Sequence, residues 1–163
     1  MHSSRWLDDF QVGERFVTQG YTFTEANIVD FATQYDPQPF HLDVSAAARS
    51  PYGGLIASGF QTLVICFSLF IQTGITIDCS IGSPGIDEVR WPAPVRPGDT
   101  LHTEVEVLEI KPSRSKPDRG IARMLYEGRN QRGEKVLSFV SNHLLLRKSS
   151  FQNDAPPTGC DRR

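Results

Sequence analysis

The spacing of hydrophobic and polar positions predicts helices in the first half of the chain and strands in the second. Aromatic residues between Glu14 and Phe23 favour a strand. Thr24 can then cap a helix, and Pro37 disfavours a helical conformation at Asp36, so this helix is predicted to end there. The i, i+3, i+4, i+7 spacing of one buried helical face is occupied by Ile28, Phe31, Ala32 and Tyr35.

Two further helices are expected before the period changes. Asp43 can cap a short helix through VSAAARS, which Pro51 ends. A glycine-rich connection, YGGLIASG, leads to FQTLVICFSLFIQT at 60–73, which is apolar on nearly every side and is followed by Gly74. A helix that is hydrophobic all round belongs in a core. Buried strands are the alternative interpretation, because short apolar runs are ambiguous.

Four segments in the second half have strand character. They read GIDEVRWPAPV, TLHTEVEVLEI, GIARMLYEGRN and EKVLSFVSNHLLLRK, with turn sequences between them. The second alternates clearly until Leu108, where the alternation blurs. The pattern predicts an α+β domain over residues 1–148, in which an antiparallel meander wraps around one long central helix. Residues 149–163 are polar and contain prolines, which is typical of a flexible tail.

Composition narrows the classes of partner. The chain has 163 residues, 17 basic and 19 acidic side chains and a formal charge of −2, so it has no field that favours nucleic acid or an anionic membrane. The longest apolar run, 63–71, is too short to span a bilayer, and the first residues lack a signal-peptide pattern, so a cytoplasmic location is expected. Three widely separated cysteines form neither a disulfide framework nor a zinc spacing, and no metal site is expected.

The stretch YDPQPFH contains the best candidates for chemistry. Asp36 and His41 are five positions apart, and prolines at 37 and 39 stiffen the segment between them. A carboxylate and an imidazole that face one water can take a proton from it and return one elsewhere. The alternative is that both are ordinary loop residues, which the spacing alone does not exclude.

Glycines supply a second signal. Gly59 stands at the start of the predicted central helix, where a backbone N–H can stabilise developing negative charge. Gly53 and Gly54 lie just before it, and a tight turn explains these glycines equally well. The carboxylate, the imidazole and the glycine together favour a catalytic interpretation.

These residues carry a resemblance to a known family. The stretch FTEANIVDFATQYDPQPFHLDVSAAARSPYGGLIASGFQTL resembles the hydratase segment of the MaoC-like dehydratases, which include the (R)-specific 2-enoyl-CoA hydratases. Asp36, Pro39, His41 and Gly59 match that family's motif in type, order and distance, and APVRPGDTL resembles its strand turn. The likeness covers roughly residues 10–147.

The resemblance implies a hotdog fold and a hydro-lyase. Asp36 and His41 would hold the water that adds to a 2-enoyl-CoA thioester, or that leaves a 3-hydroxyacyl-CoA, and the Gly59 N–H would bind the thioester oxygen. No cofactor is implied, because coenzyme A is part of the substrate. Three neighbours of these residues depart from the family pattern and are expected to shape the substrate-binding site: Gln38, Phe40 and Ser58. Phe67 occupies a position that is often serine in the family.

Several interpretations stay open at this point. A hotdog acyl-CoA thioesterase and a non-catalytic acyl-CoA-binding subunit are the alternatives to a hydratase. A homodimer or a higher homo-oligomer is expected, because pairing two copies would cover the exposed sheet edge and build a cleft for the substrate. His102 and His143 are expected to be surface or core residues, and Trp91 is expected in the core. The phosphates of coenzyme A could be bound by basic residues near turns, namely Arg90, Arg96, Arg114, Lys116 and Arg119.

Overall fold

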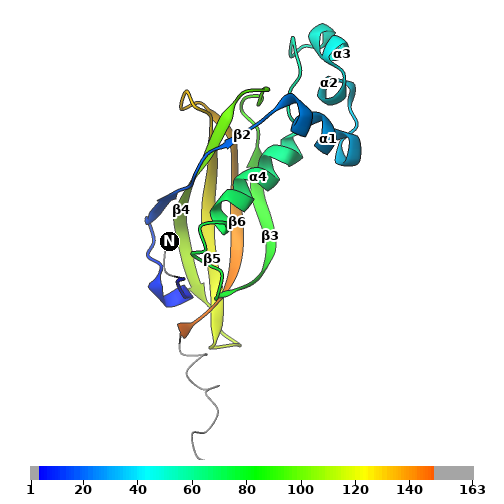
Figure 1. Ribbon diagram of the computed structural model, residues 1–163. Coiled ribbons are helices and arrows are strands. Elements are labelled where there is room, and N and C mark those ends of the chain that lie inside the picture. Colours follow the sequence, from blue (N-terminus) through cyan, green and yellow to red (C-terminus); the bar gives the residue numbers. More distant parts are fainter. Residues whose placement is uncertain (1–3, 149–163) are drawn as a thin grey trace, which may run out of the picture.

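A single antiparallel sheet wraps around one helix in the computed structural model, which describes residues 4–148 (Figure 1). The six strands are β1 (Arg15–Val17), β2 (Tyr21–Thr22), β3 (Ser80–Arg90), β4 (Thr100–Pro112), β5 (Arg119–Arg129) and β6 (Lys135–Leu146). Their order is β1-β4-β5-β6-β3, with β2 also paired to β4. The predicted α+β class is therefore confirmed. The tail predicted for 149–163 lies outside the described residues.

The helix α4 (Gly59–Ile71) packs against β4 and β5, and its side chains Cys66 and Phe70 are fully buried (Figure 1). The prediction of a long helix here is confirmed, although α4 begins one residue earlier than expected because Ser58 caps it. Its predicted place in the core is confirmed, although one face of the helix is open in the single chain. Phe60 is 62% exposed and Val64 is 51% exposed in the single chain.

The alternation predicted for β4 is confirmed where the strand covers the helix. Inward side chains from Leu101 to Val107 are buried at every second position. A register shift between Val107 and Glu109 adds one residue to β4 opposite β5. Such a bulge interrupts the two-residue period and leaves Leu108 38% exposed, which is why the sequence pattern blurs there.

The strand β3 differs most from its prediction. It runs over Ser80–Arg90 instead of 85–95, and it pairs with β6 at the sheet edge, so only β4, β5 and β6 form a meander. Its glycines and three register shifts hide any alternating pattern. Trp91 follows the strand and is 45% exposed, so the prediction that it lies in the core is wrong.

The elements that precede α4 form one edge of the sheet and one end of the molecule. A short 3-10 helix, η1 (Leu7–Asp9), precedes β1 and β2, which replace the single strand predicted over 14–23. The helices α1 (Glu25–Tyr35), α2 (Pro39–Leu42) and α3 (Val44–Arg49) gather at one end of the sheet (Figure 1). Thr24 and Asp43 cap α1 and α3 as predicted.

Tyr35 is 68% exposed, so its assignment to the buried face of α1 is wrong. No helix within residues 4–148 is long and apolar enough to cross a membrane.

Candidate functional site

Asp36 lies at a stiff elbow between α1 and α2. It caps the C-terminus of α1 with φ −152° and ψ 69°, and its backbone N–H still donates to the Ala32 carbonyl at 3.0 Å. Pro37 prevents a further helical turn at Asp36, and Pro39 opens α2 at the helical position where a missing N–H costs least. The two prolines therefore end one helix and start the next within three residues. The sequence predicted the end of α1 but not the start of α2, because α2 is too short to show a helical period.

The elbow directs Asp36 and His41 towards each other. Asp36 Oδ2 lies 3.3 Å from His41 Nε2, and His41 is only 4% exposed. On the other side of the ring, Nδ1 lies 2.7 Å from the carbonyl oxygen of Ile56. A carbonyl oxygen can only accept, so Nδ1 carries a hydrogen and donates it. In the neutral ring, Nε2 consequently presents its lone pair to the carboxylate.

The Asp36 carboxylate is held by two further side chains. Ser58 Oγ donates to Oδ2 at 2.6 Å, and Gln38 Nε2 donates to Oδ1 at 2.8 Å. Partial burial opposes ionisation, but these two hydrogen bonds, together with the electrostatic influence of His41, outweigh it and lower the pKa of Asp36. Asp36 is therefore a carboxylate at neutral pH, with its acceptor atom turned towards His41.

Ser58 and Gly59 join this carboxylate to the start of α4. Ser58 is fully buried, and its Oγ accepts the Phe60 N–H at 3.2 Å while its hydrogen goes to Asp36. The Gly59 N–H belongs to the first turn of α4, where helical N–H groups lack partners within the helix, and no residue among 4–148 accepts it. A side chain at Gly59 would place Cβ 2.8 Å from Trp91 Cε2, so the position requires glycine while Trp91 stays there.

The remaining residues predicted for this region lie around the same elbow. The Phe40 ring packs edge-on against the His41 ring, with centroids 4.5 Å apart, and also contacts Tyr52. Gly53 has φ +66° and donates its N–H to Ser50, so it makes a tight turn after α3. Asp36, His41, Gln38, Phe40 and Ser58 are thus brought together, with Gly59 beside Ser58. Their roles towards a substrate stay predictions.

The other histidines have different surroundings. His143 is 2% exposed and lies with Nε2 2.8 Å from the Tyr126 hydroxyl in the core. Phe67 stacks on the His143 ring with an interplanar angle of 8°. Burial lowers the pKa of His143 to about 4 and raises the pKa of Tyr126. The sequence missed this pair, because residues on different strands meet only once the sheet register is known.

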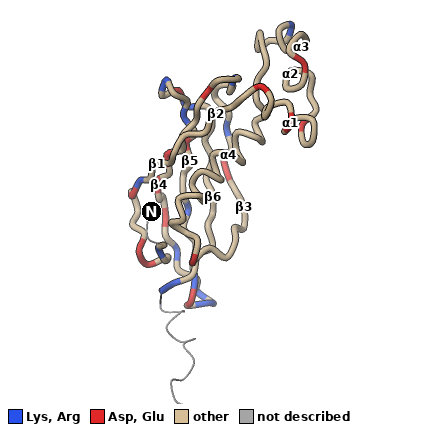
Figure 2. The backbone as a smooth tube through the Cα atoms, in the orientation of Figure 1, with Lys and Arg blue, Asp and Glu red and all other residues tan. Residues whose placement is uncertain are grey.

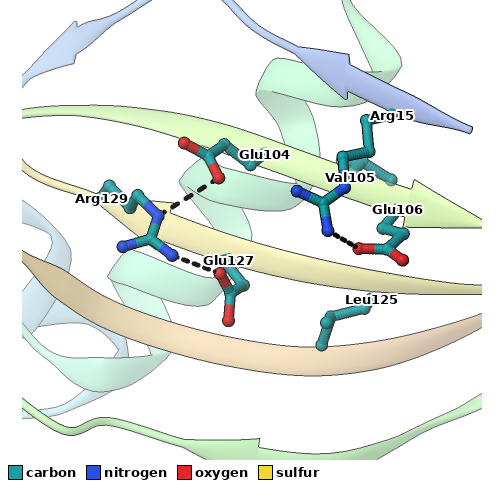
Figure 3. Close-up of a pocket in the computed structure, with 7 residues that line it drawn as sticks. All are labelled: Arg15, Glu104, Val105, Glu106, Leu125, Glu127 and Arg129. Atoms are coloured by element: carbon teal, nitrogen blue, oxygen red, sulfur yellow. Dashed lines mark hydrogen bonds and ion pairs between the residues drawn. The ribbon is translucent and has the colours of Figure 1, made fainter. Parts of the chain in front are cut away.

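Two cavities lie away from the Asp36 elbow. One is on the outer face of the sheet, has a volume of about 190 Å³ and is lined by Arg15, Glu104, Val105, Glu106, Leu125, Glu127 and Arg129. Figure 3 shows its cations paired with its acids. The second, at the turn between β4 and β5, has a volume of about 560 Å³. Neither is lined by Asp36 or His41. Within residues 4–148, no three metal-ligating side chains converge.

Comparison with known proteins gives consistent matches. The MaoC-like domain profile matches residues 9–126. YdeM, an uncharacterized protein of Bacillus subtilis, is 38% identical over 141 residues, which span 86% of this chain and 99% of YdeM. The 3-hydroxybutyryl-CoA dehydratase of Methylorubrum extorquens is 29% identical over 67% of this chain and 68% of its own length. The crystal structure of a MaoC-like dehydratase from Rhodospirillum rubrum superposes with a TM-score of 0.83 at 40% identity, covering 89% of this chain and 99% of that one.

Proposed function

The chain belongs to the MaoC-like dehydratase family and has its hotdog fold, and we propose that it is a hydro-lyase of 2-enoyl-CoA and 3-hydroxyacyl-CoA thioesters. The observation that carries this proposal is the 3.3 Å approach of Asp36 Oδ2 to His41 Nε2, with Nδ1 fixed as a donor to Ile56. The 3-hydroxybutyryl-CoA dehydratase relative supports the substrate class.

Asp36 and His41, which we call the dyad, present two hydrogen-bond acceptors to one water. With Asp36 ionised and the Nε2 lone pair free, a water that lies beside both atoms donates one hydrogen to each, which leaves its oxygen lone pairs directed away from the dyad. That oxygen adds to C3 of the enoyl thioester while one member of the dyad takes a proton. The same proton passes to C2, so the two groups of the pair act on one face of the double bond. Dehydration follows these steps in reverse.

Negative charge develops on the thioester oxygen when water adds to C3. The Gly59 N–H, at the positive end of the thirteen-residue helix α4, donates to that oxygen. Ser58 links the two halves of the site, because it holds Asp36 through its hydroxyl and immediately precedes Gly59. Ser58 is therefore a positioning residue in this mechanism.

The assembly we propose is a homodimer formed along β3 and α4. The edge strand β3 has only β6 as a neighbour. Large apolar side chains are exposed along β3, on α4 and in the connection between them: Phe60, Val64, Ile71, Ile77, Ile81 and Ile86. Phe60, Val64 and Ile71 share one helical face, which suits a second copy of the same surface. Light scattering is expected to give a dimer that Val64→Glu dissociates. A wild-type monomer would contradict this assembly.

The test of the reaction is a panel of saturated, 2-enoyl and 3-hydroxyacyl thioesters, each followed for loss of the double bond and for release of thiol. A hydro-lyase consumes the enoyl absorbance and leaves the thioester intact. Release of thiol without hydration would identify a thioesterase. Tight binding with neither reaction would identify a binding subunit. Either of these outcomes would reject the hydro-lyase.

A further inference from the structure

The turn between β4 and β5 carries an unbalanced positive charge. Four basic side chains line its cavity, Lys111, Arg114, Lys116 and Arg119, and Asp118 is the only acid between the first and the last of them. Arg119 pairs with Asp118, whereas the other three cations make no ion pair with any residue among 4–148. The segment 111–119 therefore has a formal charge of +3 in a chain whose total is −2.

The cations stand on an ordered turn. The Ser113 N–H donates to the Arg119 carbonyl at 2.9 Å, and the Lys116 N–H donates to Ser113 Oγ at 3.2 Å. Pro112 and Pro117 restrict the backbone further. Less conformational entropy is lost when a ligand binds to cations whose backbone is already fixed.

The cavity beneath these cations has a different character from its rim. Its floor includes the half-buried apolar side chains Ile121 and Leu144, and its volume of about 560 Å³ is that of a small-ligand site. The outer-face cavity of Figure 3 has cations too, but Glu106 neutralises Arg15, and Glu104 and Glu127 neutralise Arg129. A ligand with several negative charges and a flat apolar ring therefore fits the cavity at the β4–β5 turn and not the cavity on the outer face.

We propose that the cavity at the β4–β5 turn, hereafter the groove, binds the phosphorylated adenosine of a coenzyme A thioester. The acyl end of that thioester lies at the dyad of a second copy of the chain. This inference rests on the proposed function and its dimer. Phosphates would meet Lys111, Arg114 and Lys116, and the adenine ring would lie on Ile121 and Leu144.

A second copy is required by where the groove lies. Figure 2 shows the basic turn at the end of the sheet opposite α1, α2 and α3. The thirteen residues of β4 extend about 40 Å at ~3.3 Å each, which exceeds the reach of a pantetheine arm. Ser80 of β3 pairs with Leu145 at the groove end, whereas β3 finishes beside Trp91 and Gly59 at the other end. Antiparallel pairing of two β3 edges about a two-fold axis would therefore set the groove of one copy beside the dyad of its partner.

The first experiment measures nucleotide recognition in the full chain. Arg114→Ala/Lys116→Ala removes two exposed cations, and Arg15→Ala is the matched control from the neutralised cavity. Calorimetry with adenosine 3′,5′-bisphosphate is expected to show affinity at least about tenfold weaker in the double variant and unchanged in the control. Equal affinity in all three proteins would overturn the proposal.

Kinetics then separate the nucleotide from the rest of the substrate. The double variant is expected to raise KM about tenfold for an enoyl-CoA and to leave KM unchanged for the same enoyl group on pantetheine, which lacks the nucleotide. An increase only for the acyl carrier protein thioester would overturn the proposal in favour of a protein-docking surface. If no thioester is hydrated by the wild type, the proposed function fails, and the calorimetric result still decides whether the groove binds the nucleotide.

Hybrid dimers test the exchange between copies. A dimer purified with one Asp36→Asn chain and one Arg114→Ala/Lys116→Ala chain has one intact site if each dyad uses its partner's groove. Its rate at low enoyl-CoA is then expected to be about half that of the wild type. If each dyad used the groove of its own chain, the hybrid would have no intact site, and its rate would fall below that of the double variant.

Discussion

Two buried histidines in this molecule are each paired with an oxygen atom, yet they are suited to different tasks. His41 is 4% exposed beside Asp36, and His143 is 2% exposed beside Tyr126. The first partner is a carboxylate whose pKa is lowered, whereas the second is a neutral phenol whose pKa is raised. The charge of the partner and the number of polar neighbours, and not burial of the ring, distinguish the pair that we propose moves protons from the pair that fills the core.

The largest expected effect is the loss of activity when either Asp36 or His41 is substituted. Asp36→Asn and His41→Ala each remove one proton acceptor from the proposed water site, so kcat for enoyl-CoA hydration is expected to fall roughly 10²–10⁴-fold. Steady-state kinetics with an enoyl-CoA measures this loss. His102→Ala, at a partly exposed histidine near Glu104, is the control. Full activity in both dyad variants would show that the pair is not catalytic.

The core pair is expected to affect stability instead of catalysis. The pKa of His143 falls from 6.5 to about 4 in the folded chain, so the unfolded state takes up its proton first as the pH drops. The stability that the neutral ring contributes is present above about pH 6.5 and is lost as the pH falls through about 4. The free energy of unfolding is expected to decrease by about 3 kcal/mol over this range.

His143→Gln keeps a hydrogen-bonding side chain beside Tyr126 but does not titrate. Urea unfolding between about pH 7.5 and about pH 4 is expected to show a shallower loss of stability in this variant, by about 3 kcal/mol. His102→Gln serves as the surface control. An unchanged slope in His143→Gln would mean that His143 is not held neutral in the core.

A smaller effect is expected from Ser58, which connects the dyad to α4. Ser58→Ala removes a 2.6 Å hydrogen bond that lowers the Asp36 pKa, so that pKa is expected to rise and the acid limb of the pH–rate profile to move to higher pH. The loss in kcat is expected to be about tenfold. Ser68→Ala, on the same helix with its hydroxyl bonded to Ile65, is the control. A lower kcat with an unmoved acid limb would argue for a purely structural role.

The smallest effect is expected from Gln38. It also donates to Asp36, at 2.8 Å, but it is exposed and water can replace it. Gln38→Ala is therefore expected to reduce kcat only about twofold to threefold. Gln34→Ala, at an exposed position on α1, is the control. A loss as large as that of Ser58→Ala would show that solvent does not replace the Gln38 bond.

The strands that cover α4 were predictable because their signal is local. One buried face produces a two-residue period, as in β4 up to Val107, and even the bulge at Leu108 left a trace in the pattern. The strand β3 was misplaced for the opposite reason. It has no buried face in the single chain, so its sequence shows neither the period nor its pairing with β6.

The sequence by itself determined the elbow, because Pro37 and Pro39 restrict the backbone between Asp36 and His41 whatever surrounds them. It also determined the start of α4 to within one residue, and the α+β class. Only the tertiary structure decided that Ser58 holds Asp36, that Ile56 fixes the His41 tautomer, and that His143 meets Tyr126. The physical reason is that dihedral preferences act between neighbours in the chain, whereas a hydrogen bond between residues 15 to 22 positions apart depends on packing that brings their elements together.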